Sequence, residues 1–329
     1  MKAAWYSNNG SAEDVLEIGE KATPRAGPGE VRVRLHTSGV NPVDVKRRAG
    51  GRGATAEPYV IPHFDGAGVI DEVGEGVDGG RVQQRVWVYE AQWQSQSGTA
   101  AEFVTLDSSR AVPLPEAASF NDGACLGIPA LTAHRCVFGD GSVDGQTLLV
   151  TGGAGAVAHY AIQFAVLDGA RVITTVSGPE KARIASAAGA SEVLNYREES
   201  VVDRVLELTD GRGVDRVVEV EFGGNLTDAL GATRVGGTIS TYASQAVPEP
   251  QIPFYELLYR NVAVRFELVF LMAEESKAAA VADLTRWLSE GRLQHNVAET
   301  FPLSEVVQAH QAVEAGPLGK IMLDVGTQA

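Results

Sequence analysis

Cysteine is nearly absent from this sequence, which contains only Cys125 and Cys136 among its 329 residues. Two cysteines are too few for the disulfide framework of a small secreted protein. We expect both to be small apolar core residues, in a protein of the reducing cytoplasm. The first five residues, MKAAW, open a predicted strand and do not resemble a signal peptide.

Basic charge is also scarce. The chain has 27 lysines and arginines against 42 aspartates and glutamates, which gives a formal net charge of −15. Such a balance argues against nucleic acid or an anionic membrane surface as a partner. No apolar run approaches the roughly 18 residues of a transmembrane helix. These absences leave a small molecule as the expected partner.

Metal ligands with suitable spacing are missing as well. The six histidines show no pair such as H-x₃-H; they are His36, His63, His134, His159, His295 and His310. A catalytic zinc needs three protein ligands and an open fourth position. His63 and Asp65 could supply two at most, and we interpret them as a packed loop histidine and a turn-capping aspartate. We therefore predict no metal site.

The most informative segment that is present runs from Leu148 to Ser177 and reads LLVTGGAGAVAHYAIQFAVLDGARVITTVS. Its apolar start, Leu148–Val150, is typical of a buried parallel strand. A helical apolar pattern follows up to Gly169, and Arg171–Val176 is the next predicted strand. The segment therefore predicts a strand–turn–helix–strand unit.

The turn within this unit fits the pattern G-x-G-x-x-A. Gly153 permits a tight turn, and Gly155 lets the backbone approach a pyrophosphate closely. The small Ala158 lets the helix pack tightly on the strand. Ala156 and Val157 begin the helix, whose free N–H groups attract phosphate. Together with the two strands, the turn predicts a dinucleotide-binding site.

The tip of the second strand indicates which dinucleotide binds. Sites for NAD usually carry an acid there, bonded to the ribose 2′-hydroxyl. This chain has no acid at the tip, and Glu180 lies a few residues too late. Ser177 and Lys181 could instead hold a 2′-phosphate by hydroxyl and charge. We therefore predict NADPH as the cofactor, with a solvated Lys181 as the plainer alternative.

The overall pattern predicts an α/β protein of two domains. Residues 1–118 are rich in strands and turns, and residues 119–270 alternate helix and strand, as in a doubly wound parallel sheet. A helix over Glu274–Glu290 and a final strand over Gly319–Val325 complete the first domain. The six strands predicted for the second domain are Leu148–Thr151, Arg171–Val176, Glu192–Leu194, Arg216–Val220, Gly237–Thr241 and Val262–Phe266.

Several motifs occur in the order typical of one superfamily and cover nearly the whole chain. They are Ser38–Asp44, His63–Ile70, Leu131–Ala133, the turn Gly153–Ala158, Asn195–Arg197, Gly236–Thr238 and Gly319–Ile321. With them the chain resembles the zeta-crystallin-like quinone oxidoreductases of the medium-chain dehydrogenase/reductase superfamily. The resemblance implies a GroES-like domain, a Rossmann domain, a cleft between them, and NADPH-dependent reduction of quinones or similar alkenes, commonly by homodimers.

Zinc alcohol dehydrogenases of this superfamily differ at the positions that bind metal. They have a cysteine where this chain has Asn41, and Gly-His-Glu where it has Phe64-Asp65-Gly66. They also have a lobe with four cysteines, whereas this chain has no cysteine before Cys125. The resemblance therefore implies zinc-independent hydride transfer from C4 of NADPH, in which the protein orients the reactants and excludes water.

The resemblance also implies roles for individual residues. Asn41 and Thr132 would line the nicotinamide and ribose, Tyr196 and Lys181 would flank the 2′-phosphate, and Lys320 would lie near the cofactor phosphates. The backbone of Tyr242-Ala243 and the side chain of Phe270 would frame the nicotinamide. Plainer alternatives are a turn residue for Asn41, a helix cap for Thr132, a core tyrosine for Tyr196 and a surface lysine for Lys320. Asn41, Lys46, Phe64, Tyr89, Trp93 and Phe270 are the expected substrate pocket.

Lys46 departs from the family, which often has a tyrosine facing the substrate there. Its ammonium could assist an anionic product or point to solvent. The glycine-rich stretch that follows, residues 49–53, suggests a mobile lip of the cleft.

Three functions stay open: a quinone reductase, a reductase of enones or enoyl thioesters, and a non-enzymatic crystallin-like or RNA-binding protein. The net charge of −15 argues against RNA.

The apolar segment Asn261–Phe270 is predicted to be the last strand of the Rossmann sheet. An uncovered edge of this kind invites pairing with a second copy. We therefore expect a homodimer that joins two sheets edge to edge. In the alternative, the helix over Glu274–Glu290 covers the edge and the protein is a monomer.

Overall fold

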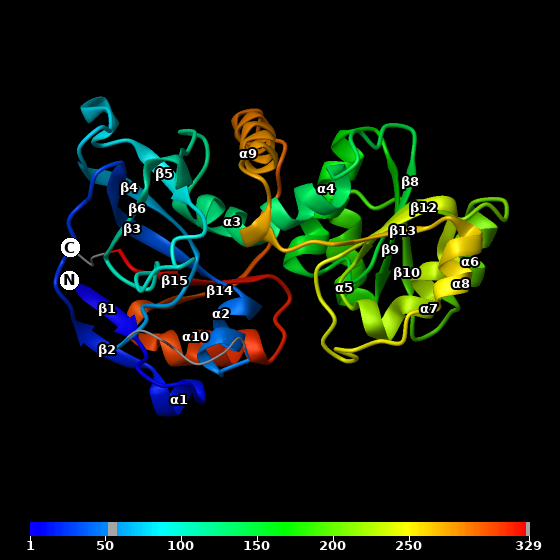
Figure 1. Ribbon diagram of the computed structural model, residues 1–329, viewed down its shortest axis with the longest axis horizontal. Helices are drawn as coiled ribbons and strands as arrows, with labels where there is room; N and C mark the ends of the chain where they lie inside the picture. The colour runs from blue at the N-terminus through cyan, green and yellow to red at the C-terminus, as the bar shows by residue number, and fades with distance from the viewer. Residues whose placement is uncertain (52–57, 327–329) are drawn as a thin grey trace. The chain divides into compact units, whose positions relative to one another are not determined.

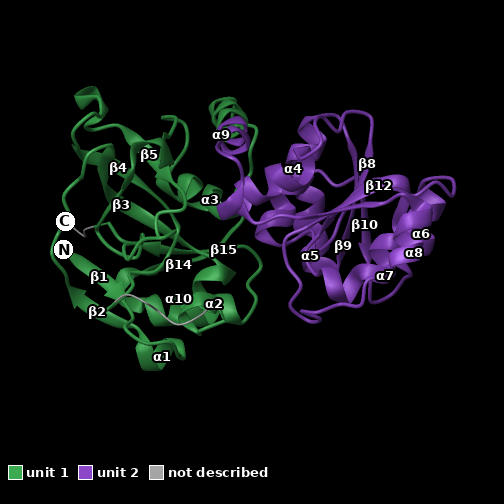
Figure 2. Ribbon diagram, in the orientation of Figure 1, with its two compact units in different colours: residues 1–128, 281–329 green, residues 129–280 purple. Residues whose placement is uncertain are grey.

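The computed structural model describes residues 1–51 and 58–326, and it is a mixed α/β chain (Figure 1). It divides into two compact units, one of residues 1–128 and 281–329 and the other of residues 129–280 (Figure 2). Of the glycine-rich stretch predicted as a lip, Arg52 and Gly53 lie outside the described residues. No helix in the described ranges is both long enough and apolar enough to span a membrane.

The first unit is built around a seven-stranded sheet. Its central strand β3 (Glu30–Val40) buries Val31, Val33 and Leu35 on one face, as the alternating sequence predicts. The order along the sheet is β14 (Val297–Pro302), β15 (Lys320–Asp324), β3, β4 (Asp65–Val73), β5 (Arg85–Val88) and β7 (Ala111–Pro113), and β6 (Phe103–Asp107) also pairs with β3. A separate pair, β1 (Lys2–Trp5) and β2 (Glu17–Glu20), is antiparallel.

The end of the chain returns to this first unit. Strand β15 pairs antiparallel with β3, with Ile321 opposite Val40 and Met322 opposite Gly39. The register brings Lys320 beside Asn41, which begins the helix after β3. The helices of the unit are α1 (Ala12–Val15), α2 (Pro42–Arg48) and α10 (Val306–Glu314), while α3 (Phe120–Phe138) and α9 (Glu274–Ser289) each contain a boundary between the units.

The second unit is a parallel sheet with helices between its strands, which confirms the predicted doubly wound class. Its order is β10 (Glu192–Asn195), β9 (Arg171–Val176), β8 (Thr147–Val150), β11 (Val214–Glu219), β12 (Thr233–Thr241) and β13 (Ala263–Phe266). The helices are α4 (Ala156–Leu167), α5 (Pro179–Ala187), α6 (Val201–Leu208), α7 (Phe222–Ala232) and α8 (Phe254–Arg260). The chain order reverses between β8 and β11, which is where such sheets bind ligands.

Two sequence predictions for this unit are wrong in detail. The last strand agrees with the predicted Val262–Phe266 to within one residue but does not extend over Asn261–Phe270, because pairing with β12 ends at Phe266 and Val269–Leu271 forms a 3₁₀ turn. The tight turn after β8 is made by Gly152, which has φ +68°, and not by Gly153. A Cβ on Gly153 would lie 2.2 Å from Oγ1 of Thr174, so that glycine is needed for close packing.

Candidate functional site

The turn between β8 and α4 presents an unfilled set of backbone donors. Gly155 precedes the helix in an extended conformation, with φ −73° and ψ 154°. The first hydrogen bond of α4 runs from His159 N–H to Gly155 O, so the N–H groups of Ala156, Val157 and Ala158 have no acceptor inside the helix. A Cβ on Gly155 would meet Gly152 O at 3.2 Å and nothing nearer. Such a terminus suits a phosphate group.

The residues predicted to hold the 2′-phosphate lie close together after β9. Lys181 Nζ donates to Ser177 Oγ at 2.9 Å. The N–H of Tyr196 donates to the carbonyl of Val176 at 3.2 Å, and 52 % of the Tyr196 residue is exposed. Tyr196 is therefore not a core tyrosine. The ammonium of Lys181 and the hydroxyl of Ser177 thus meet just after β9, and the backbone of Tyr196 pairs with the last residue of that strand.

The other predicted residues of the second unit lie elsewhere on the sheet and its helices. Thr132 and Phe270 are buried, in α3 and in the turn after β13. Tyr242 follows β12, and burial raises the pKa of its phenol well above the usual value, so the hydroxyl keeps its proton. The Ala243 carbonyl accepts the N–H of Phe222 at 2.9 Å, which fixes the loop backbone after β12.

Sequence reasoning missed Glu219, a fully buried carboxyl at the end of β11. Its Oε1 accepts hydrogen bonds from the Thr151 hydroxyl, the Glu221 N–H and the Asn225 amide, at 2.7 to 3.0 Å. Burial raises its pKa. The signal in the sequence was an acidic residue at the end of an apolar strand, at the point where the chain order reverses.

In the first unit, Asn41, Asp65 and Lys320 form a buried cluster. Asn41 Nδ2 donates to Asp65 Oδ2 at 2.7 Å, and Lys320 Nζ donates to the same oxygen at 3.0 Å and also to Asn41 Oδ1. Lys320 is only 4 % exposed, so it is not a surface lysine. The ammonium therefore already has a carboxylate and an amide oxygen as partners within its own unit.

Asp65 has a third donor, the N–H of Ile128 at 2.9 Å. That N–H lies at a break in α3, where Gly127 has φ 11° and ψ −115° and Pro129 follows. A Cβ on Gly127 would lie 1.9 Å from Asp65 Oδ1, so only glycine fits there. The predicted capping role of Asp65 is thus fulfilled at a helix break, and its carboxylate is fixed by three separate segments.

Asp44 completes the cluster and was also missed in the sequence. Its Oδ2 accepts the Asn41 N–H at 2.6 Å, while its Oδ1 is buried and has no hydrogen-bond partner among the described residues. Burial, with the neighbouring Asp65 charge, raises the pKa of Asp44 to about 8. Asp44 therefore carries a proton at neutral pH. The Asn-Pro-Val-Asp spacing, which is that of a helix cap, was the available signal.

His63 is buried, which agrees with a packed loop histidine. It also belongs to a row of hydrogen-bonded side chains. Its Nδ1 lies 2.9 Å from Ser38 Oγ, and its Nε2 lies 2.9 Å from His310 Nε2. Burial lowers the pKa of His63 well below its usual value and that of His310 to about 3. Both rings are therefore neutral at physiological pH.

The remaining predicted pocket residues differ in exposure. Phe64 and Tyr89 are buried in the first unit, and the Arg47 guanidinium lies 5.5 Å from the Phe64 ring centre. Lys46 and Trp93 are half-buried. That these four side chains line one substrate pocket stays a prediction.

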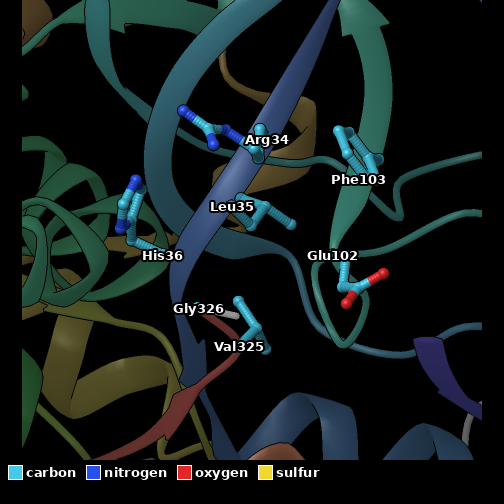
Figure 3. Close-up of a pocket in the computed structure, with 7 residues that line it drawn as sticks. All are labelled: Arg34, Leu35, His36, Glu102, Phe103, Val325 and Gly326. Atoms are coloured by element: carbon cyan, nitrogen blue, oxygen red, sulfur yellow. The ribbon is translucent and has the colours of Figure 1, made fainter. Parts of the chain in front are cut away.

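A surface hollow of about 90 Å³ in the first unit contains none of the predicted site residues (Figure 3). It lies around β3, against the neighbouring strand β6 and the end of the chain. Ligand pockets for molecules of drug size have volumes of roughly 300–1,000 Å³. The hollow is too small for a dinucleotide. Its lining residues are Arg34, Leu35, His36, Glu102, Phe103, Val325 and Gly326.

Two family patterns match this chain. Residues 27–116 match the alcohol dehydrogenase GroES-like domain, and residues 156–286 match the zinc-binding dehydrogenase family. The first match lies in the β-rich unit, and most of the second lies in the unit with the parallel sheet. The predicted combination of a GroES-like domain with a Rossmann domain is confirmed.

Three individual proteins show the same relationship. The quinone oxidoreductase of Mus musculus is 30 % identical over 300 residues, which cover 89 % of this chain and 88 % of that protein. A mycobacterial protein solved with NADPH is 29 % identical, with a TM-score of 0.87 over 98 % of this chain and 99 % of its own. An NAD-dependent alcohol dehydrogenase is 31 % identical, with a TM-score of 0.90 over 99 % of this chain and all of its own.

Proposed function

The chain belongs to the quinone oxidoreductase family of the medium-chain dehydrogenase/reductase superfamily, and we propose that it reduces a quinone by hydride transfer from NADPH. The observation that carries the proposal is the pair of phosphate sites in the second unit. One is the open helix terminus at Gly155, and the other is the Lys181–Ser177 pair beyond β9. They suit the pyrophosphate and the 2′-phosphate of one NADPH molecule.

NADPH supplies a hydride from C4 of its nicotinamide when it is bound. The residues proposed for the nicotinamide end are Asn41, Thr132, Phe270 and the backbone of Tyr242-Ala243, and those for the 2′-phosphate are Ser177, Lys181 and Tyr196. The protein holds the two reactants in one orientation and excludes water. The quinone takes up the hydride and one proton from solvent and leaves as hydroquinone.

A screen of NADPH oxidation tests this proposal. The purified protein is given quinones, enones and enoyl thioesters as separate acceptor classes. We expect quinones to give the highest kcat/KM. Enones and enoyl thioesters belong in the screen because their reductases share the motifs of this chain. A clearly higher kcat/KM with enones or enoyl thioesters would make that class the substrate in place of quinones. The absence of any NADPH oxidation would contradict an enzymatic role.

Lys181→Ala tests the choice of cofactor. A charge-assisted contact to phosphate is worth roughly 1.5–3 kcal/mol, so we expect NADPH to bind at least about tenfold more weakly to the variant. NADH lacks the 2′-phosphate, so its affinity is expected to stay within about twofold. Fluorescence titration of both cofactors measures this. Tighter binding of NADH than of NADPH by the unmodified protein would sink the assignment, and the similarity to an NAD-dependent enzyme makes the comparison necessary.

We also propose that the enzyme works without zinc. The position that holds a zinc-ligating cysteine in alcohol dehydrogenases is Asn41 here, and its Oδ1 is bonded to the Lys320 ammonium. Asp65 is bonded to the same ammonium. Within residues 1–51 and 58–326 no group of three or more His, Cys, Asp or Glu side chains is arranged to hold a metal. Elemental analysis is expected to find well under one zinc per chain, and a stoichiometric zinc whose chelation abolishes activity refutes the proposal.

A homodimer is the proposed assembly. Strand β13 is the last strand of its sheet, and the preceding helix α8 carries exposed apolar side chains beside it. Tyr259 is 81 % exposed and Phe266 is 70 % exposed. Large exposed apolar patches on a folded chain mark interaction sites, and free sheet edges pair. The other members of this surface are Phe254, Tyr255, Leu258, Leu268 and Leu271.

Light scattering is expected to give twice the chain mass of 34.7 kDa at micromolar concentration. Tyr259→Asp places a charge in the proposed interface and is expected to yield the single-chain mass with unchanged NADPH affinity. Val235→Asp is the matched control, because Val235 is also exposed, at 65 %, but lies near the start of β12. A single-chain mass for the unmodified protein defeats the dimer.

The cytoplasm is the proposed location, in keeping with two buried free cysteines.

A further inference from the structure

Lys320 has a hydrogen-bonding capacity that the first unit does not use. An ammonium has three N–H donors. Two of them are directed at Asp65 Oδ2, 3.0 Å away, and at Asn41 Oδ1. Among the residues that the structure describes, no third acceptor is found for this group. One N–H of a buried, fixed cation is therefore available to a ligand.

The backbone around Lys320 is shaped to hold its side chain. Gly39 lies on β3, opposite Met322 on β15. A Cβ on Gly39 would lie 2.8 Å from Lys320 Cε and 2.3 Å from the Ala124 carbonyl oxygen. Any larger residue at position 39 would push the lysine stem away from its place. The chain thus leaves a narrow passage for this one side chain.

Stability alone does not account for the arrangement. Burying an ion pair costs desolvation energy that the attraction between the charges often fails to recover. Asn41 is the N-cap residue of α2, and Asp44 accepts its backbone N–H in a capping box. The Asn41 amide is also bonded to Asp65 and Lys320. The cost of burying the two charges is explained if the cluster serves to aim the ammonium.

The cluster carries no net negative charge that would oppose an incoming anion. Asp65 and Lys320 carry one negative and one positive charge. Asp44, the second carboxyl, keeps its proton at neutral pH because burial and Asp65 raise its pKa to about 8. No second carboxylate of this cluster therefore opposes a negative charge that develops beside the ammonium. In a buried site such an interaction is far stronger than in water.

We propose that Lys320 is a catalytic residue whose free N–H stabilises the oxygen that becomes negative when the quinone accepts the hydride. Asp65 is a positioning residue that fixes the ammonium, and Asn41 holds it from the other side. This inference rests on the proposed function. It differs from the expectation that Lys320 contacts the cofactor phosphates, because both described partners of the ammonium lie in the first unit.

The C4–H bond of NADPH breaks with its electron pair, and a new bond to hydrogen forms on the quinone. NADPH is oxidised to NADP⁺ and the quinone is reduced to the hydroquinone anion. The Lys320 N–H donates a hydrogen bond to the anionic oxygen without giving up its proton. Solvent then supplies the proton that completes the hydroquinone.

Lys320→Met tests the proposal, since it keeps the length of the side chain and removes the charge. Loss of one preorganised donor of this kind lowers kcat by roughly 100-fold. We expect that decrease with quinone, while the Kd for NADPH stays within about twofold. The decrease is also expected to grow for quinones of lower reduction potential, whose oxygens carry more charge in the transition state. A purely structural lysine would not produce that trend.

Two further variants keep the test decisive if Lys320→Met folds poorly. The double variant Lys320→Met with Asp65→Asn removes both charges, and the amide oxygen introduced at position 65 can still accept the Ile128 N–H. It is expected to recover thermal stability but not kcat. Lys277→Met removes another buried lysine, 2 % exposed and paired with Glu274 at 3.1 Å, and is expected to leave kcat unchanged.

Three outcomes overturn the inference. One is a raised Kd for NADPH with unchanged kcat, which assigns Lys320 to the cofactor phosphates. The second is recovery of kcat together with stability in the double variant, which makes the ion pair structural. The third is an equal loss of kcat with all quinones. If instead the unmodified protein oxidises no NADPH with any quinone, the proposed function itself has failed.

Discussion

Gly155→Asp is expected to abolish NADPH binding without disturbing the fold. Gly155 is the N-cap of α4 and has an ordinary extended backbone, so the backbone conformation accepts aspartate; its Cβ would lie 3.2 Å from Gly152 O, which must shift by a few tenths of an ångström. Aspartate is also a favourable N-cap residue. Its carboxylate, however, would occupy the helix terminus proposed for the pyrophosphate. Like charges repel there, and the side chain takes up the donors that a phosphate needs.

The expected loss of NADPH affinity is at least about 100-fold, which corresponds to roughly 2.7 kcal/mol. Fluorescence titration measures it, and thermal unfolding verifies that the fold is retained. Gly155→Asn is the matched control, because asparagine has the shape of aspartate without the charge. It is expected to bind NADPH better than Gly155→Asp does. If Gly155→Asp keeps its affinity within about threefold, the pyrophosphate does not lie at this helix.

Acidification is expected to destabilise the first unit, because of His63 and His310. Their pKa values are lowered in the folded state by burial, aided by the His310 and Lys320 charges for His63 and by Arg48 for His310. The folded state then binds fewer protons than the unfolded chain below about pH 6.5. The stabilisation is fully present above that pH and is lost as the pH falls toward the folded values.

Each histidine contributes a slope of roughly 1.4 kcal/mol per pH unit between about pH 6.5 and 5. Asp44, whose folded pKa is raised to about 8, contributes a slope of about the same size in the opposite sense, so the net cost over this range is about 2 kcal/mol. Urea unfolding over that range measures the slope. His310→Gln can still donate to His63 Nε2, and it is expected to remove most of the slope. His295→Gln, a change in a half-buried histidine elsewhere, is the control. A slope that is the same in His310→Gln as in the unmodified chain contradicts this assignment.

The parts of the structure that the sequence predicts well depend on local signals. The apolar run Leu148–Val150, the glycines after it and the strand Arg171–Val176 lie within about thirty residues, so their pattern alone defines the unit. The pair Ser177–Lys181 is separated by four residues, and the structure joins the two by a hydrogen bond of 2.9 Å. Residues this close in sequence can be recognised as one motif without knowledge of the fold.

The cluster at Lys320 could not be predicted in this way. Its contact with Asn41 spans 279 residues, and its contact with Asp65 spans 255. Only the return of β15 to β3 brings these side chains together, and the register of that pairing is set by tertiary packing. The early end of strand β13 could not be predicted for the same reason. Its apolar sequence continues beyond Phe266, but its pairing with β12 ends there. The resemblance to a family suggested a cofactor contact for Lys320 but not these partners, because a motif does not specify side-chain contacts.

Hydride transfer from NADPH to a quinone can be followed over a single turnover. The protein is mixed anaerobically with NADPH and then with a quinone, and both products are quantified. We expect NADP⁺ and hydroquinone to form in equal amounts, and deuterium at C4 of NADPH to slow the step. NADPH that stays intact with every quinone while an enone or enoyl thioester oxidises it, or NADH that reacts faster than NADPH, would refute NADPH-dependent quinone reduction.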